Sequence, residues 1–182
     1  MFKKLKNISI TQRVLFLFLL VSIFSFSKEF WEKKNFTVNV TESLTINGST
    51  KSKGYIMTYG GGALKLQITF PNINKGEVYT FRSGSKTIYY PSLKQTVTQK
   101  LHKDEANILG VFNKLSSLSS KKTQTKNGDT FTFSNSKLIS IRSKGYTVNF
   151  SNYSTSNGYS YPKTITVRDG SSQVTYSLSN FR

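Results

Sequence analysis

Side chains that carry out chemistry are scarce in this sequence, and they are not grouped. His102 is the only histidine, cysteine is absent, and eight acidic residues are spread over 182 positions. A catalytic Ser–His or Cys–His pair needs a histidine beside its nucleophile, and a zinc site needs several His or Cys ligands at close spacing. No such grouping surrounds His102, which we expect to have a surface or capping role. The sequence therefore predicts a protein that is not an enzyme and that holds no metal ion or cofactor.

Two short motifs resemble functional sites only superficially. Gly60-Gly61-Gly62 lacks the lysine and the following helix of a phosphate-binding loop. We interpret it as a bend or bulge between two strands. Asp104 and Glu105 are adjacent at the start of a predicted helix, where the helix dipole favours negative charge without any catalytic task.

Residues 1–27 have the pattern of a cleavable secretory signal. Four basic residues, Lys3, Lys4, Lys6 and Arg13, precede an apolar run from Val14 to Phe26, and Ser25 and Ser27 offer the small side chains that a signal peptidase recognises. We therefore expect cleavage after Ser27 and one exported domain over residues 28–182. The alternative is a retained N-terminal anchor, but the apolar run is shorter than the ~20 residues of a spanning helix. The absence of cysteine excludes a lipid-modified N-terminus.

The positive charge of the chain is large but dispersed. The net charge is +18, and the predicted signal holds four of the 26 Lys and Arg and none of the acidic residues, which leaves +14 for residues 28–182. Such a charge favours contact with anionic lipid surfaces or polyanions. Because the lysines are spread along the chain, this is weak evidence for any one partner.

Apolar and polar residues alternate along most of the chain between Phe36 and Leu178, as in half-buried antiparallel strands. Residues 28–35 are polar and are predicted to be a loose lead-in, with Trp31 at its surface. About ten or eleven strands are expected in a meander. Turn dipeptides separate them, at Asn47-Gly48, Ser83-Gly84, Asn127-Gly128, Lys144-Gly145, Asn157-Gly158 and Asp169-Gly170.

One segment has the period of a helix instead. Asp104 is a suitable N-cap, and the apolar residues that follow are spaced by one, three and four positions, at Ile108, Leu109, Phe112, Leu115 and Leu118. It is the one convincing helix that we predict in residues 28–182.

This order of elements resembles the LolA-like family of periplasmic outer-membrane lipoprotein carriers, over most of residues 28–182. The matching segments are Phe36–Val40 with the Asn-Gly hairpin, Lys53–Ile56, Leu64–Pro71, Ser83–Pro91, Asn107–Phe112 and Tyr161–Val167. One departure concerns an Arg-Pro that the family has after the strand ending near Tyr59. Gly60-Gly61-Gly62 stands there instead, and Lys65 could supply the charge but not the planar fork of arginine.

The resemblance implies an incomplete, half-closed β-barrel: a curved antiparallel sheet whose apolar concave side is covered by a helical lid. It also implies a monomeric periplasmic carrier that binds acyl chains of lipoproteins, or lipids, and moves them from the inner towards the outer membrane. The implied partners, besides this cargo, are an inner-membrane release machinery and an outer-membrane acceptor; no nucleic acid is expected.

The ligand-binding residues that follow are those of the apolar strand faces and of the helical stripe, namely Tyr55, Met57, Leu64, Leu66, Ile68, Phe81, Ile88, Tyr90, Ile108, Phe112 and Leu115. Periodicity alone favours a filled barrel in which the strand residues are core, whereas the resemblance favours a lined cavity. A second hypothesis is an exported β-rich interaction protein that binds anionic polymers or envelope surfaces through its charge.

Overall fold

The computed structural model describes residues 27–182 except 83, 102–113, 119 and 171. Nearly all of the predicted signal lies outside the described residues, so cleavage after Ser27 stays a prediction. Ile108 and Phe112, which we predicted to lie on the helix, are also outside them.

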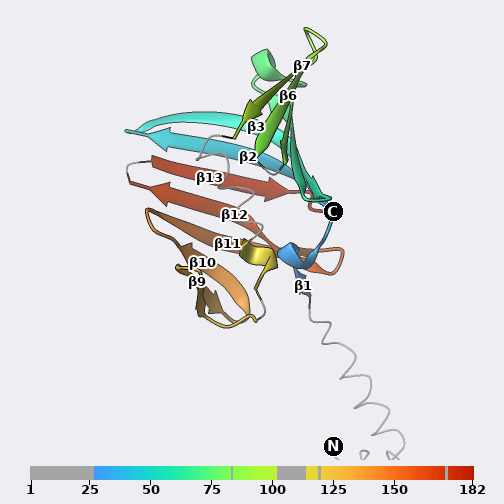
Figure 1. Ribbon diagram of the computed structural model, residues 1–182. Helices are drawn as coiled ribbons and strands as arrows, with labels where there is room; N and C mark the ends of the chain where they lie inside the picture. The colour runs from blue at the N-terminus through green and yellow to red at the C-terminus, as the bar shows by residue number, and fades with distance from the viewer. Residues whose placement is uncertain (1–26, 83, 102–113, 119, 171) are drawn as a thin grey trace, which may run out of the picture.

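Nearly all of the described chain belongs to one antiparallel sheet (Figure 1). Two single turns of 3-10 helix accompany it, η1 (Phe30–Glu32) and η2 (Asn72–Asn74). The strands are β1 (Lys28–Glu29), β2 (Phe36–Ile46), β3 (Ser49–Gly60), β4 (Ala63–Phe70), β5 (Val78–Arg82), β6 (Ser85–Tyr90), β7 (Gln95–Lys100), β8 (Gln124–Lys126), β9 (Asp129–Ser134), β10 (Lys137–Arg142), β11 (Tyr146–Ser156), β12 (Tyr159–Asp169) and β13 (Ser172–Ser179).

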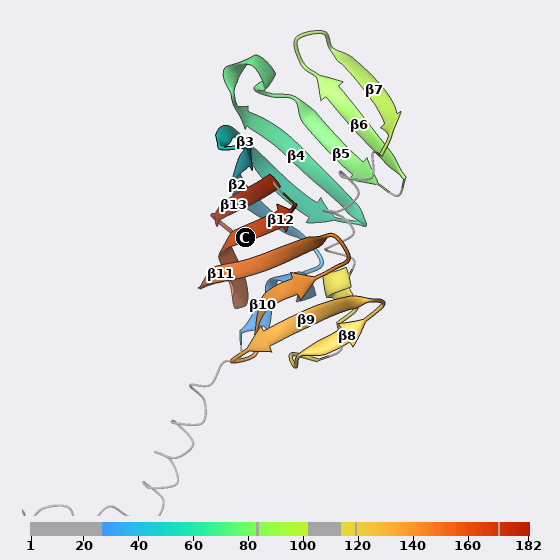
Figure 2. The ribbon, with the colours of Figure 1, turned by 90° about the vertical axis from the view of Figure 1, so that its left-hand side faces the viewer.

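The sheet is open and curved. Its strands are hydrogen-bonded in the order β7-β6-β5-β4-β3-β2-β13-β12-β11-β10-β9-β8, and β1 pairs in parallel with β12. Figure 2 shows β7 and β8 at opposite ends of this curve. The predicted fold class, mainly β with an incomplete barrel, is confirmed. The sheet has 13 strands rather than ten or eleven, because β1 and β8 are too short to show any alternation.

The hairpin turns form where the Asn-Gly pairs predict them. Asn47 and Gly48 between β2 and β3 have φ angles of 49° and 78°. Asn157 and Gly158 between β11 and β12 have nearly the same values, 50° and 77°. A type I′ turn needs positive φ at both central residues, and asparagine and glycine tolerate this best. These turns fix the register of the long strands that they join.

One face of the sheet, which we call the inner face, carries the hydrophobic core. The register places Val38 of β2 opposite Met57 of β3, and Met57 opposite Leu66 of β4. The strands from β13 to β9 continue this alignment of apolar residues, and Phe131 of β9 pairs with Ile141 of β10. Because side chains alternate across a strand, this register gathers the apolar residues of nearly every strand on the inner face.

Residues 28–35 are not a loose lead-in, and this prediction is wrong. The backbone N–H of Lys28 donates to the carbonyl of Gly158 at 3.0 Å, and β1 extends this pairing with β12. Phe30 in η1 is buried, and its ring meets the ring of Trp31 edge-on at 5.0 Å. Trp31 itself is partly buried against the core. A two-residue parallel strand followed by a single helical turn has no periodicity that the sequence could reveal.

Candidate functional site

The inner face brings together the strand residues that we predicted to contact a ligand. Tyr55 and Met57 of β3 lie there beside the buried side chains of β4, β5 and β6, and Tyr90 at the end of β6 is half-buried. The buried members are Tyr55, Met57, Leu64, Leu66, Ile68, Phe81 and Ile88. Their burial agrees with a core role, and a ligand-binding role for them stays a prediction.

The end of the predicted helix packs against the same face. Residues 114–116 are helical, and Leu115 is only 1% exposed within the core cluster. Lys114 fixes this turn to the sheet, because its Nζ lies 2.7 Å from the Asp129 carboxylate and 3.3 Å from the Tyr146 hydroxyl. Burial disfavours the charged lysine, but these hydrogen bonds outweigh it and raise the pKa of Lys114. Leu115 therefore belongs to a fixed end of the helix.

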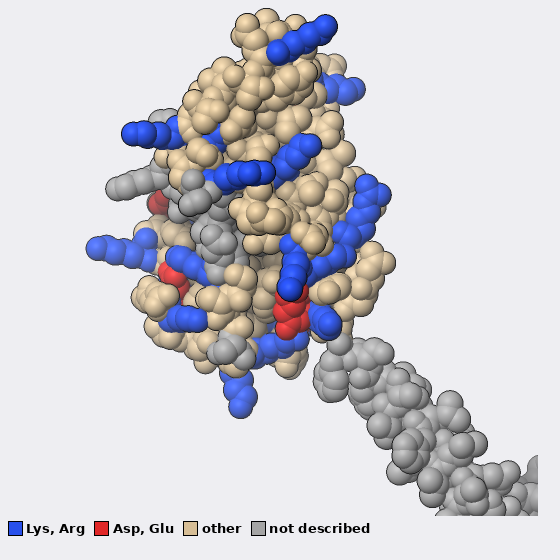
Figure 3. Space-filling model, turned by 45° about the vertical axis from the view of Figure 1, so that its right-hand side comes forward, with Lys and Arg blue, Asp and Glu red and all other residues tan. Residues whose placement is uncertain are grey.

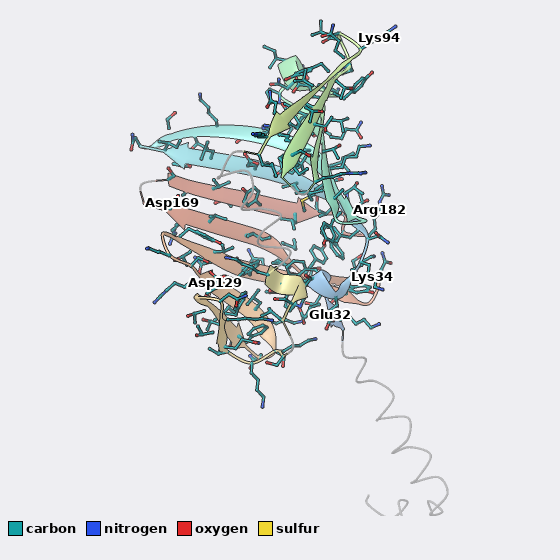
Figure 4. All side chains as sticks on the ribbon, viewed as in Figure 1. Glu32, Lys34, Lys94, Asp129, Asp169 and Arg182 are labelled. Carbon is teal, nitrogen blue, oxygen red and sulfur yellow. The ribbon has the colours of Figure 1, made fainter. Side chains whose placement is uncertain are left out.

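Aromatic rings close one end of the inner face, and we call this the closed end. The rings of Tyr161 and Phe181 stack at 4.8 Å, and Phe36 lies 5.3 Å from Phe181. Phe30 and Trp31 of η1 extend this cluster, with Trp31 meeting Phe133 edge-on. The C-terminal residues are held by paired backbone hydrogen bonds between Thr37 and Arg182. Figure 4 shows this end at the right, near Glu32, Lys34 and Arg182.

The opposite end, where the apolar side chains of β2, β11, β12 and β13 are half-buried or exposed, is the open end. Its inner-face apolar residues are Leu44, Ile165, Val167 and Val174. Polar groups lie among them, since the Tyr55 hydroxyl donates to Glu42 Oε2 at 3.0 Å. Burial and the nearby Glu42 carboxylate raise the pKa values of Tyr55 and Tyr176, so both phenols stay protonated at neutral pH. Figure 4 shows this end at the left, near Asp129 and Asp169.

A buried carboxylate beside the closed end was missed by the sequence analysis. Glu29 of β1 is 1% exposed, and its Oε1 lies 3.2 Å from Lys137 Nζ and 3.5 Å from Lys121 Nζ. Burial raises the pKa of Glu29, although both lysines act to lower it. Lys137 also donates to the Ser160 hydroxyl at 2.6 Å. These residues are up to 108 positions apart in the sequence, and no local pattern connects them.

The glycines that replace the family's Arg-Pro form a turn, as we predicted. Gly61 and Gly62 have φ angles of 57° and 70° between β3 and β4. Lys65, which we considered as a replacement charge, points to the outer face of the sheet. There it lines a shallow depression of about 660 Å³ together with Arg82 and Tyr89. Lys65 therefore does not supply a charge to the inner face.

Comparison with solved structures identifies the fold. A LolA superfamily protein from Nitrosomonas europaea is 12% identical over 82% of this chain and 86% of its own, with a TM-score of 0.53. A domain described as an outer membrane lipoprotein-sorting protein, from Vibrio parahaemolyticus, is 12% identical over 85% and 86%, with a TM-score of 0.54. A DUF1329 family protein from Desulfovibrio piger is 11% identical over 82% and 85%, with a TM-score of 0.57.

The chain has a LolA-like fold. No protein-family model and no curated protein matches the sequence itself. The structural likeness spans more than four-fifths of each chain compared, far more than one hairpin. Within the described residues, no helix is both long and apolar enough to span a membrane.

Proposed function

We propose that this protein is a carrier that binds the acyl chains of lipoproteins, or of lipids, on its inner face and moves them from the inner towards the outer membrane. The observation that supports this most is the open, curved sheet with one apolar face, together with the fold that the chain shares with a LolA superfamily structure. One neighbour of this fold is described as an outer membrane lipoprotein-sorting protein domain. The proposed setting is the periplasm after removal of residues 1–27.

The energetics of an acyl chain suit such a face. Each methylene that leaves water contributes about 0.8 kcal/mol, so a long chain gains on the order of 10 kcal/mol. A carrier must also release its cargo. Side chains that occupy part of the inner face in the free protein lower the net affinity, because the acyl chain has to displace them. Ile108 and Phe112 are proposed for this role.

The open end is the proposed entrance for the acyl chain. Its apolar side chains are half-buried, whereas the rings of the closed end leave little apolar surface to water. A chain that enters at this end and runs along the inner face towards the closed end reaches Tyr55 and Met57. The polar, uncharged groups of the cargo next to its acyl chain then stay near Glu42 and the tyrosine hydroxyls, which provide hydrogen-bonding partners at the edge of the apolar surface.

The test compares two neighbouring substitutions on β13. Val174 points to the inner face and Thr175 to the outer face, so Val174→Glu and Thr175→Glu place the same charge on opposite sides of one strand. A buried unpaired charge disfavours an apolar ligand, so Val174→Glu should weaken binding of a fluorescent fatty acid at least about tenfold. Thr175→Glu should leave binding unchanged. Equal binding by both variants, with unchanged thermal melts, would exclude the inner face as the acyl site.

A second candidate function is binding of an anionic polymer at the outer face. Lys65 and Arg82 line the depression there and give it positive charge. Such binding should weaken steeply between low and physiological salt, whereas acyl binding should persist. Lys65→Gln and Arg82→Gln would weaken the polymer complex and leave fatty-acid binding intact.

A further inference from the structure

Two connections at one end of the sheet form a protruding tip. The β4–β5 connection covers residues 71–77 and contains η2, and the β6–β7 connection covers residues 91–94. They lie against each other, since a Cβ placed on Gly76 would be 3.3 Å from Pro91 Cγ. We call residues 71–76 and 91–94 the wing tip. Figure 1 shows it at the top of the molecule, and Figure 4 labels Lys94 there.

The wing tip carries the two most exposed large apolar side chains of the described residues. Ile73 in η2 is 88% exposed, and Leu93 in the β6–β7 connection is 63% exposed. The other exposed large apolar residues lie between 37% and 44%. Scattered exposed apolar residues are ordinary on protein surfaces. Here, however, the two most exposed ones protrude from two connections that touch each other.

The wing tip also carries positive charge. Lys75 and Lys94 are both exposed, one on each connection. Between residues 70 and 101 the only acidic residue is Glu77. Glu77 is buried, and it accepts hydrogen bonds from Asn74 and Tyr79 at 2.9 and 2.5 Å. Figure 3 shows no acidic side chain on the upper part of the face in view. The wing tip is therefore apolar and cationic, without exposed negative charge.

Hydrogen bonds within each of the two connections hold its turn in place. The amides of Asn74 and Lys75 donate to the carbonyls of Pro71 and Asn72 at 3.1 and 3.2 Å. The amide of Lys94 donates in the same way to the carbonyl of Pro91 at 3.3 Å. Ile73 and Leu93 are thus presented from ordered turns, so little conformational entropy is lost when they become buried.

We propose that the wing tip docks on an anionic phospholipid membrane, with Ile73 and Leu93 inserted at the level of the headgroups and Lys75 and Lys94 against the phosphates. Interfacial binding combines buried apolar area with attraction between basic residues and anionic lipids, and the wing tip offers both. A soluble polyanion would pair with the lysines but would leave the apolar side chains in water. This membrane contact uses none of the inner-face residues proposed for acyl binding.

The test measures binding of the exported protein to vesicles of phosphatidylcholine mixed with phosphatidylglycerol, by co-sedimentation. The variant Ile73→Asp/Leu93→Asp should bind at least about tenfold more weakly, because two apolar side chains no longer leave water. Ile139→Asp, at an exposed isoleucine of β10, is the matched control and should bind normally. All variants share one N-terminus, so any contribution from it is common to them.

The lysines are tested separately. Lys75→Gln and Lys94→Gln should each weaken binding about fivefold, since one lysine near an anionic surface contributes about 1 kcal/mol. Vesicles of phosphatidylcholine alone should then bind wild type and lysine variants equally. The proposal is overturned if the Ile73→Asp/Leu93→Asp variant binds like wild type, or if Ile139→Asp loses as much affinity. Loss of binding in the lysine variants alone would assign the contact to a polyanion.

These assays test acyl binding and membrane docking independently of each other. The wing-tip variants should keep wild-type affinity for the fluorescent fatty acid, and Val174→Glu should keep wild-type affinity for vesicles. Val174→Glu could bind fatty acid normally while Ile73→Asp/Leu93→Asp loses vesicle binding. That result would support membrane docking by the wing tip and contradict acyl binding on the inner face.

Discussion

The closed end of the inner face is held by aromatic packing, whereas the open end is held by hydrogen bonds among polar side chains. At the closed end Phe181 contacts Tyr161 and Phe36 ring to ring. At the open end the Tyr55–Glu42 bond and the Lys114–Asp129 ion pair join neighbouring elements. Ring packing is lost only with a large loss of stability, while a polar contact exchanges with water at a net cost of about 1 kcal/mol. Movement that admits a ligand is therefore expected at the open end.

The largest expected effect is at the closed end. Phe181→Ala removes a ring that is 3% exposed and stacked on Tyr161, so the free energy of unfolding should fall by about 3–5 kcal/mol. Leu44→Ala at the open end should cost less than about 2 kcal/mol, because Leu44 is only half-buried. Urea unfolding of both variants measures the difference. Equal losses would contradict the division into a closed and an open end.

The second-largest effect is expected for the ion pair between Lys114 and Asp129, which holds the helical turn against the sheet. Asp129→Asn removes the negative partner of Lys114 but keeps a hydrogen-bonding side chain. Because the Lys114 side chain is 38% exposed, water replaces part of the interaction, and we expect a loss of about 1–2 kcal/mol. Trypsin cleavage after Lys114 should become faster in this variant than in wild type. A large loss of stability without faster cleavage would show that Asp129 acts in the core rather than at the helix.

A smaller effect is expected for the Tyr55–Glu42 bond. Tyr55→Phe removes the hydroxyl that donates to Glu42 and should lower the free energy of unfolding by about 0.5–1.5 kcal/mol. Water can reach the half-buried Glu42 and compensate part of the loss. A double-mutant cycle with Glu42→Gln isolates the pair, and a coupling energy near zero would mean that the bond does not hold the open end.

The smallest expected effect is a dependence of stability on pH at the closed end. It arises from Glu29, a buried carboxylate beside the aromatic rings. Its pKa is raised above the usual 4.5 by burial, so the folded protein takes up a proton on Glu29 at a higher pH than the unfolded chain does. This group therefore stabilises the folded state increasingly as the pH falls from neutral towards 4.5.

Glu29→Gln removes this titration and is the matched variant. The free energy of unfolding of wild type minus that of Glu29→Gln should rise as the pH is lowered through the interval above 4.5. Thermal or urea unfolding at several pH values measures it. A difference that is flat with pH would show that Lys137 and Lys121 offset the effect of burial.

The strands and turns followed from the sequence because they depend on local rules. Alternation predicted the faces of β2, β3 and β4, and the Asn-Gly pairs predicted turns whose φ angles are positive at both residues. The segment around Phe30 did not follow, since a two-residue strand and one 3-10 turn have no period. Trp31 looked like a surface residue because its partner Phe133 lies about a hundred positions away in the sequence.

The sequence predicted which residues share the apolar face of the candidate site. It did not predict that this face has a closed end and an open end. Periodicity placed Tyr55, Leu66 and Ile88 on one side of the sheet, and the structure buries all three. The distinction between a closed and an open end arises from contacts between distant elements, such as Phe36 with Phe181. It also depends on charged groups that face each other only after folding, as Glu29 and Lys137 do. No spacing in the sequence encodes those contacts.

An open sheet leaves two unpaired edges, and unpaired edges invite other chains to add strands. Among the described residues, β7 and β8 each have one strand neighbour. β8 has only three residues, too few to template a stable addition. β7 has six, all exposed, and its sequence Gln-Thr-Val-Thr-Gln-Lys holds one apolar side chain, Val97. The open curve of the sheet therefore comes with a liability to aggregate, which a short edge at β8 and a polar edge at β7 counteract.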